Sequence, residues 1–287
     1  MGRKGNITFF RLNSLLFTYF IDSCKLYSKD VIIMTITLRK RMIEHIPVLE
    51  LSPENKVSEA LPLVVYYHGW QTKKELALTA GKKIAQHNIR VIIPDSMYHG
   101  ERKVLNPTKI PSFRFWSTIQ HNLSEFSIIK DFYLERKLIQ DGLLGVAGFS
   151  MGGMTTAGIL THFPEVKAAA ILMGAPNYQD FINRVISYMK KENIYHVPVL
   201  EDLLSWTKHF DLNVMPEKIA GRPLYFWHGT EDPKLPYEIT HQFYLDNVNT
   251  IYGKGMRFDT GVGEPHILTI DIMNRTGDFF KESFKTY

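Results

Sequence analysis

Residues 148–152, with the sequence Gly-Phe-Ser-Met-Gly, restrict the possible folds of this chain more than any other segment. The preceding residues, 143–147, form an apolar run typical of a buried strand, and residues 153–160 have the pattern of a closely packed helix. A strand, a tight turn with serine at its apex, and a helix are the context of a nucleophile elbow. The pattern therefore predicts that Ser150 is presented at the tip of a strand–turn–helix unit.

The two glycines of this pattern have a steric reason. The serine at the apex is expected in a strained backbone conformation, and side chains two residues to either side would collide with the crossing strand and helix. Gly148 and Gly152 have no such side chains. Because the five-residue pattern alone is common, the prediction depends on the strand and helix around it.

Length and composition are those of a globular α/β protein. The chain has 287 residues, of which 45% are hydrophobic and 22% charged, enough for one large domain or two small ones. No repeat or low-complexity linker divides it, so we expect one domain over residues 34–287. Cys24 is the single cysteine, which excludes an intrachain disulfide and a cysteine-based zinc cluster. A reducing compartment, and hence a cytoplasmic location, is expected.

The net charge of +5 does not indicate a nucleic-acid partner. Residues 1–41 carry eight basic and two acidic side chains, so the remainder of the chain is close to neutral. A nucleic-acid-binding domain would show a basic face in its folded part. We therefore expect no nucleic-acid partner.

The first 33 residues differ from the rest of the chain. Arg3 and Lys4 precede an apolar stretch, 12–21, which resembles a weak signal peptide but is too short and too polar to span a membrane. Met34 stands just before the first strand-like pattern, and we hypothesise that translation starts there. Residues 1–33 would then be an extension that the native protein lacks. If they are native, the alternative is an exported or membrane-tethered protein.

Strand and helix patterns alternate along the body of the chain, which predicts a mostly parallel, doubly wound sheet flanked by helices. Strands are expected at 41–51, as an antiparallel edge strand, and at 63–67, 90–95, 143–147, 166–173, 223–227 and 255–258. Helices are expected at 73–87, 113–139, 153–160, 237–247 and 267–285. Residues 176–218 interrupt the alternation, and we expect them to form a helical cap over the carboxyl edge of the sheet.

A nucleophilic serine needs a histidine base that is held by a carboxylate. In hydrolases of this topology the order along the chain is Ser, then Asp or Glu, then His. Asp232 follows the strand at 223–227 and is the expected acid, with Glu231 as its rival.

The base is chosen by position among the histidines that follow the serine. The six candidates are His162, His196, His209, His228, His241 and His266. His162 lies at the far end of the elbow helix, His241 in mid-helix, and the other early ones precede the acid. His266 remains, in the loop between the last strand and the last helix, and is the expected base.

The tetrahedral intermediate of such a reaction needs donors for its oxyanion. Met151, directly after the nucleophile, is expected to supply one backbone N–H, and Trp70, in the loop after the strand at 63–67, the other. His68 is expected to orient that loop.

These motifs together resemble the α/β-hydrolase superfamily over about residues 42–287. The resemblance is to the branch that contains prolyl oligopeptidases and dienelactone hydrolases, and within it to small bacterial serine esterases. It rests on residues 67–70, 148–153, 228–232, 265–266 and the loop 95–102. It implies that His99 and Arg102 are structural or pocket residues. The chain departs from oligopeptidases in having no propeller, and from dienelactone hydrolases in having serine rather than cysteine at position 150.

The residues thus predict a serine hydrolase that cleaves small carboxylic esters through an acyl-enzyme intermediate, without metal or organic cofactor. The alternatives are a peptidase for short peptides and a catalytically inactive fold that binds a small molecule. The side chains expected to line the substrate pocket are His68, His99, Phe113, Phe115, Trp116 and Trp206.

Overall fold

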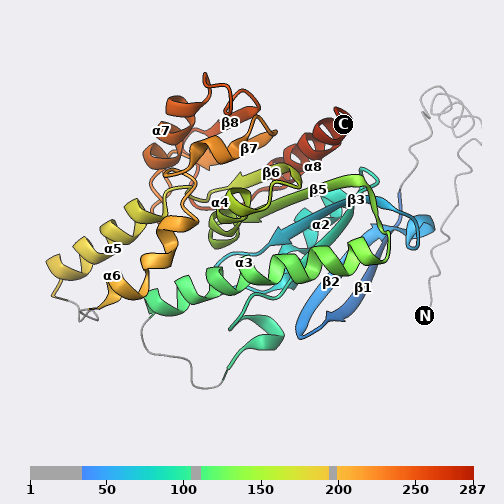
Figure 1. Ribbon diagram of the computed structural model, residues 1–287, viewed down its shortest axis with the longest axis horizontal. Coiled ribbons are helices and arrows are strands. Elements are labelled where there is room, and N and C mark those ends of the chain that lie inside the picture. Colours follow the sequence, from blue (N-terminus) through green and yellow to red (C-terminus); the bar gives the residue numbers. More distant parts are fainter. Residues whose placement is uncertain (1–33, 105–110, 194–198) are drawn as a thin grey trace, which may run out of the picture. The chain divides into compact units, whose positions relative to one another are not determined.

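The computed structural model describes residues 34–104, 111–193 and 199–287, of which those from 35 onward form one compact unit (Figure 1). The expected N-terminal extension, residues 1–33, and with it the hypothesis of a start at Met34, lies outside the described residues. So does His196.

In the described part of the chain, eight strands form one sheet in the order β1-β2-β4-β3-β5-β6-β7-β8 (Figure 1). The six strands β4, β3, β5, β6, β7 and β8 pair in parallel, whereas β2 pairs antiparallel with both of its neighbours, the edge strand β1 and β4. This confirms the predicted mostly parallel sheet. The strands are β1 (Ile36–Ile43), β2 (Ile46–Pro53), β3 (Leu61–Tyr67), β4 (Arg90–Pro94), β5 (Ile139–Phe149), β6 (Val166–Leu172), β7 (Leu224–Gly229) and β8 (Met256–Gly261).

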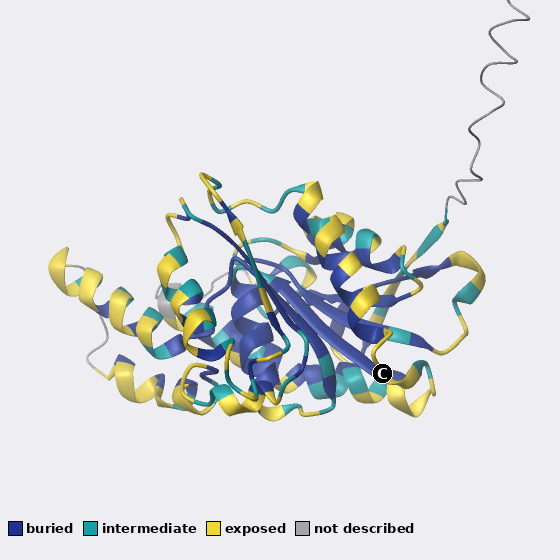
Figure 2. Ribbon diagram, turned by 90° about the horizontal axis from the view of Figure 1, so that it is seen from above, coloured by how far each residue is buried: buried dark blue, intermediate teal, exposed yellow. Residues whose placement is uncertain are grey.

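Helices cover both faces of the sheet and leave its central strands buried, whereas the edge strands β1 and β8 are partly exposed (Figure 2). On one face pack α2 (Leu78–Ala85) and α8 (Ile270–Phe284), and on the other α3 (Pro111–Glu135), α4 (Met151–His162) and α7 (Tyr237–Asn247). Every residue of α4 before its last is buried. The elbow helix is therefore held on all sides, which fixes the position of the serine at its start.

The predicted edge strand at 41–51 was wrong. The structure has a hairpin there, β1 and β2, because Glu44 adopts a left-handed φ of 49° and turns the chain before Ile46. The apolar alternation continues on both sides of the turn, so the sequence pattern alone did not mark it. Likewise the long helix ends at Glu135, since Lys137 has a φ of 54° and Ile139 already belongs to β5.

Between β6 and β7 the chain forms a helical insertion, in the segment predicted to be a cap. It contains α5 (Tyr178–Lys191) and α6 (Leu200–Leu203), followed by 3₁₀ turns at Ser205–His209 and Pro216–Ile219 (Figure 1). One side of α5 is buried through Tyr178, Ile182 and Ile186, Phe181 and Val185 next to it are half-buried, and the opposite side is exposed. This amphipathic packing fixes α5 on the domain.

Candidate active site

Ser150 sits at the tip of β5, where the chain turns into α4. Its φ is 57°, and its N–H donates to the carbonyl of Leu172 on β6 at 2.9 Å. The flanking glycines are required by space: a Cβ on Gly152 would lie 2.1 Å from the Tyr67 oxygen, and one on Gly148 would lie 2.3 Å from the carbonyl carbon of Gly152. The strand–turn–helix unit predicted from the sequence is therefore present with its steric cause.

Three side chains from distant parts of the chain form one line of hydrogen bonds. The Ser150 hydroxyl donates to His266 Nε2 at 2.9 Å, and His266 Nδ1–H donates to Asp232 Oδ2 at 2.6 Å. A carboxylate can only accept, so the proton of the neutral imidazole lies on Nδ1 and Nε2 is free to accept from serine. The structure thus brings together the predicted nucleophile, base and acid.

The Asp232 carboxylate is buried and fully hydrogen-bonded. Its Oδ1 accepts the backbone N–H groups of Lys234 and Leu235 at 2.8 and 3.0 Å. Its Oδ2 accepts from His266 and also lies 3.1 Å from Nε2 of His228. Burial raises the pKa of the Asp232 carboxyl, but the hydrogen bonds from two histidines and two amides hold that pKa well below its usual range. The acid is therefore ionised and cannot rotate freely.

Glu231 and two of the other candidate histidines lie away from these three side chains. The Glu231 side chain is exposed, while its backbone N–H donates to the carbonyl of Glu264. His162 stacks on Phe210 at the end of α4, and His241 lies on α7. None of these side chains is hydrogen-bonded to Ser150 or Asp232 in the described residues.

Met151 and Trp70, predicted as oxyanion donors, both line the cavity that contains Ser150. Met151 is the first residue of α4, so its N–H has no partner within the helix. The Trp70 ring is packed edge-on against Phe115 and His99, with ring centroids 5.4 and 4.9 Å away. The two residues next to Trp70 in the chain, Gly69 and Gln71, each form a backbone hydrogen bond with a buried histidine.

His68 and His99 link the loop after β3 to the loop after β4 in a reciprocal way. His68 accepts the Ser96 N–H on Nε2 at 3.1 Å and donates from Nδ1 to the carbonyl of Gly69 at 2.9 Å. His99 accepts the Gln71 N–H on Nε2 at 3.0 Å and donates from Nδ1 to a carbonyl of its own loop. Each loop thus supplies a histidine that binds the backbone of the other, and Trp70 lies between the two attachments.

Burial keeps these two histidines neutral. Desolvation lowers the pKa of His68 to about 4 and lowers that of His99, against smaller opposing effects from the carbonyls that they bind. A charged ring could not accept a backbone N–H on Nε2. Both residues are therefore structural: His99 in one of the two roles that the resemblance implied, and His68 as the residue expected to orient its loop. The predicted lining role for His68 is wrong, because it is not among the residues that line the cavity of Ser150.

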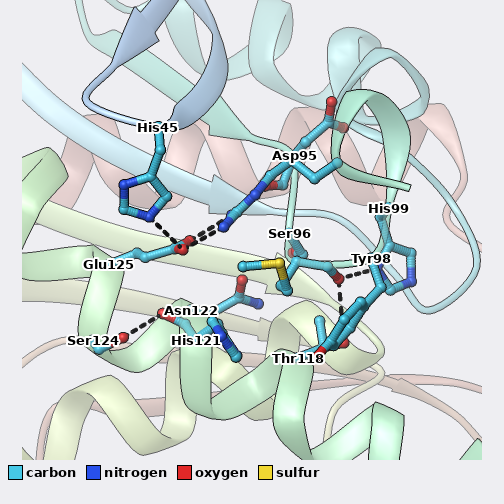
Figure 3. A network of polar contacts seen from close by, with 12 residues as sticks. His45, Asp95, Ser96, Tyr98, His99, Thr118, His121, Asn122, Ser124 and Glu125 are labelled. Carbon is cyan, nitrogen blue, oxygen red and sulfur yellow. Dashed lines mark hydrogen bonds and ion pairs between the residues drawn. The ribbon is translucent and has the colours of Figure 1, made fainter. Parts of the chain in front are cut away.

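The loop after β4 is itself fastened by buried ion pairs. Asp95 accepts the Lys74 ammonium at 2.5 Å, and Arg102 binds the Glu125 carboxylate with both terminal nitrogens at 2.5 and 2.7 Å. His45 reaches the same Glu125 carboxylate from the β1–β2 turn (Figure 3). Arg102 thus joins the loop to α3 and lies outside the cavity of Ser150.

A cavity of about 510 Å³ opens above Ser150 and is mainly apolar. Of the predicted lining residues, Phe115 and Trp116 belong to it. Trp206 lies behind Trp116, at a ring distance of 6.3 Å, and His99 faces a neighbouring pocket of about 570 Å³. These two predictions, like that for Phe113, were wrong because they rested on residue type without knowledge of how the loop after β4, the turn Ser205–His209 and α3 pack.

Sequence reasoning missed part of the lining. The cavity is completed by Phe149, Met154, Phe181, Val185, Lys234 and Leu235, besides the loop 69–72 and the residues already described. Phe181 and Val185 are one turn apart on α5, so the helical insertion forms one wall of the cavity. An amphipathic pattern in 178–191 could have indicated a face, but not which cavity that face borders.

Two searches of the described residues bear on other site types. No group of three or more His, Cys, Asp or Glu side chains there is arranged to hold a metal ion. Within the same residues, none of the helices combines the length and the apolar character needed to cross a membrane.

Comparison with known proteins places this architecture among the esterases. The chain is 33% identical over 222 residues to "Putative esterase YitV" of Bacillus subtilis (strain 168), which covers 76% of this chain and 87% of that protein. It is 25% identical over 247 residues to "Esterase YjfP" of Escherichia coli (strain K12), covering 86% and 99%. The crystal structure of TT1662 from Thermus thermophilus superimposes with a TM-score of 0.71 at 18% identity, covering 88% of this chain and 99% of that one. No family model matches the chain.

The identity to YitV exceeds what a shared fold alone requires, and it extends over most of both chains. The sheet order and the similarity to the solved structure agree with the fold that the resemblance implied. The chain therefore belongs to the α/β-hydrolase superfamily and, within it, to the esterase family of YitV, whose members are hydrolases of ester bonds.

Proposed function

We propose that the chain is a serine esterase that hydrolyses small and medium carboxylic esters through an acyl-enzyme intermediate. The observation that carries this proposal is the line of hydrogen bonds from Ser150 through His266 to Asp232 on the floor of the apolar cavity. A hydroxyl with a base at 2.9 Å has the geometry needed to lose its proton as it attacks.

In the first half-reaction the Ser150 oxygen attacks the ester carbonyl and His266 Nε2 takes the hydroxyl proton. The oxyanion that forms is stabilised by the N–H groups of Met151 and Trp70, each of which contributes roughly 2.7–4 kcal/mol in comparable sites. His266 then returns the proton to the departing alcohol oxygen, and the C–O bond breaks. The product is an acyl group esterified to Ser150.

In the second half-reaction water takes the place of the alcohol. His266 removes a proton from the water molecule as its oxygen attacks the acyl carbon, and the same amides hold the second oxyanion. The proton then passes to Ser150, and the carboxylic acid leaves. Asp232 remains ionised throughout and stabilises the imidazolium, which agrees with the lowered pKa of its carboxyl.

The lining of the cavity supports an apolar group on the substrate. Phe115, Trp116 and Phe181 are among the side chains around Ser150, and Lys234 is the one Lys, Arg, Asp or Glu side chain among the described lining residues. The volume of about 510 Å³ lies within the usual range for small-molecule sites. We therefore expect esters with an acyl or alcohol group of moderate size to be preferred over charged ones.

Two measurements test this proposal. A fluorophosphonate should label the wild-type protein at Ser150, and a panel of p-nitrophenyl esters of increasing chain length should show turnover that rises with apolar contact. The Ser150→Ala variant should lose kcat by roughly 10⁴-fold or more. Near-normal turnover by that variant would refute the proposal, and hydrolysis of aminoacyl-naphthylamides without ester preference would favour a peptidase.

A further inference from the structure

His228 is a fully buried histidine beside the site that the mechanism above does not use. It lies on β7, four residues before Asp232, and its ring is 0% exposed. Its Nε2 lies 3.1 Å from Asp232 Oδ2 and 2.9 Å from the carbonyl oxygen of Leu235. His228 and His266 thus contact the same oxygen of the Asp232 carboxylate.

The partners of the ring define which nitrogen carries the proton. A carbonyl oxygen only accepts hydrogen bonds, so Nε2 must be the protonated nitrogen and must donate. Nδ1 is buried and has no hydrogen-bond partner among the described residues. A proton on Nδ1 would be buried without an acceptor, which is costly. The geometry therefore favours the Nε2–H tautomer, with its donor shared between Asp232 and Leu235.

The N–H of His228 gives Oδ2 of Asp232 a second hydrogen-bond donor. Asp232 Oδ2 receives one N–H from His266 and one from His228, while Oδ1 receives two backbone amides. His228 also donates to the carbonyl oxygen of Leu235, and the backbone N–H of Leu235 donates to Asp232. The turn 232–235 thus closes around the carboxylate. The titratable groups that touch the His228 ring are Asp232 and, edge-on, Tyr237 of α7.

We propose that His228 is a positioning residue for the reaction: its Nε2–H holds Asp232 in the orientation that His266 needs and tempers the negative charge on the shared oxygen. Without that donor, the carboxylate gains a second rotational position, and Oδ2 interacts more strongly with a protonated His266. The first effect slows every step in which His266 must be correctly oriented. The second makes the protonated, inactive base persist to higher pH. This inference rests on the proposed serine-esterase function.

The test compares three substitutions at position 228. His228→Gln keeps an N–H donor at the place of Nε2, His228→Phe keeps the ring without a donor, and His228→Asn has a donor too short to reach Asp232. We expect kcat to fall roughly tenfold to a hundredfold in the Phe and Asn variants with little change in KM, the effect of a small misplacement at a reacting group. The Gln variant should recover most of the loss.

Two further readouts separate positioning from packing. The acid limb of the kcat/KM pH profile should move to higher pH in the Phe and Asn variants and return in the Gln variant. In an Asp232→Asn background, His228→Phe should cost no more than about twofold, since two residues that act through one another are not additive. Circular dichroism and thermal melting establish that each variant is folded. If the Phe variant does not fold, the comparison of the Gln and Asn variants still tests the proposal. His241→Phe, on α7 and without contact to Asp232, is the control.

The outcomes are distinct from those of the proposed function. A folded Phe or Asn variant with wild-type kcat and an unmoved acid limb overturns the inference, as does a folded Gln variant as poor as the Phe and Asn variants. An undiminished loss in the Asp232→Asn background also overturns it. If instead the wild-type protein is not labelled at Ser150 by a fluorophosphonate, it is the serine-esterase function that fails.

Discussion

The two sides of Ser150 use buried histidines in opposite ways. On the oxyanion side, in the loops after β3 and β4, His68 and His99 bind the main chain with both ring nitrogens. On the acid–base side, in the loops after β7 and β8, His266 binds side chains with both of its nitrogens, Ser150 with one and Asp232 with the other. The residue type is the same, and the partners differ.

That difference separates a structural histidine from one that can transfer a proton. A ring held by an amide donor and a carbonyl acceptor is stable only when neutral, and desolvation reinforces this by lowering the pKa of His68 and His99. A ring held between a hydroxyl and an ionised carboxylate can gain a proton without losing either partner. Under the proposed function, the oxyanion side would therefore serve as a rigid frame, and the acid–base side would be the one that changes charge.

The largest effect is expected from the acid–base side. Asp232→Asn should lower kcat by about 10⁴-fold, because an amide at this position no longer selects the tautomer of His266 that accepts from serine. Steady-state kinetics on a p-nitrophenyl ester measure it. Glu231→Gln, an exposed neighbour, is the matched control and should stay within about twofold of wild type. Equal losses in the two variants would contradict the distinction between the two carboxylates.

On the oxyanion side, the burial of His68 should instead make the free energy of unfolding depend on pH. The pKa of His68 falls from 6.5 to about 4 on folding, so the unfolded chain binds the proton more tightly. The free energy of unfolding is therefore complete above about pH 6.5 and falls as pH drops toward 4, by up to about 3 kcal/mol from this group. Urea denaturation at pH 7 and pH 5 measures the loss.

The matching variant is His68→Gln, which keeps an acceptor for the Ser96 N–H but cannot titrate. The stability difference between pH 7 and pH 5 should shrink in this variant, even if its stability at pH 7 is somewhat lower. An unchanged difference would mean that other groups account for the acid sensitivity of the fold.

The smallest of the three effects is expected from His99, on the oxyanion side. His99→Phe removes the acceptor of the Gln71 N–H, so the adjoining Trp70 amide should move and kcat should fall roughly tenfold to a hundredfold, less than complete loss of an oxyanion donor. KM should change little. His162→Phe, exposed at the end of α4, is the control histidine. A wild-type kcat in the folded His99→Phe variant would contradict a role of His99 in positioning the Trp70 amide.

Much of this site could be predicted from sequence because its three central residues follow strands. Ser150, Asp232 and His266 come after β5, β7 and β8, and the carboxyl ends of parallel strands meet at one edge of a sheet. Order along the chain then selected Asp232 and His266 as the expected acid and base, and the structure places both side chains beside Ser150. The same rule led us to set His228 aside, since it precedes the acid, and so its contact with Asp232 could not be seen from the sequence.

The cavity wall could not be predicted in the same way. Phe115 and Trp116 were expected and found, but Trp206 packs behind Trp116, and Phe181 and Val185 of α5 take the place expected for it. Which face of an insertion meets the sheet depends on packing between segments far apart in the chain. The turn at Glu44 was missed for a related reason, since apolar alternation runs through it unbroken.

Local sequence was sufficient for the parallel strands, the elbow and the order of Ser150, Asp232 and His266, because hydrophobic periodicity and the steric need for Gly148 and Gly152 act over a few residues. The shape of the cavity and the reciprocal linkage of the loops after β3 and β4 came from tertiary contacts. The contacts of that linkage join residues 28 positions apart, and their energies depend on burial and hydrogen-bond partners that no short segment contains. The contact between His228 and Asp232 is local in sequence, but the path of the chain through the turn after β7 decides it.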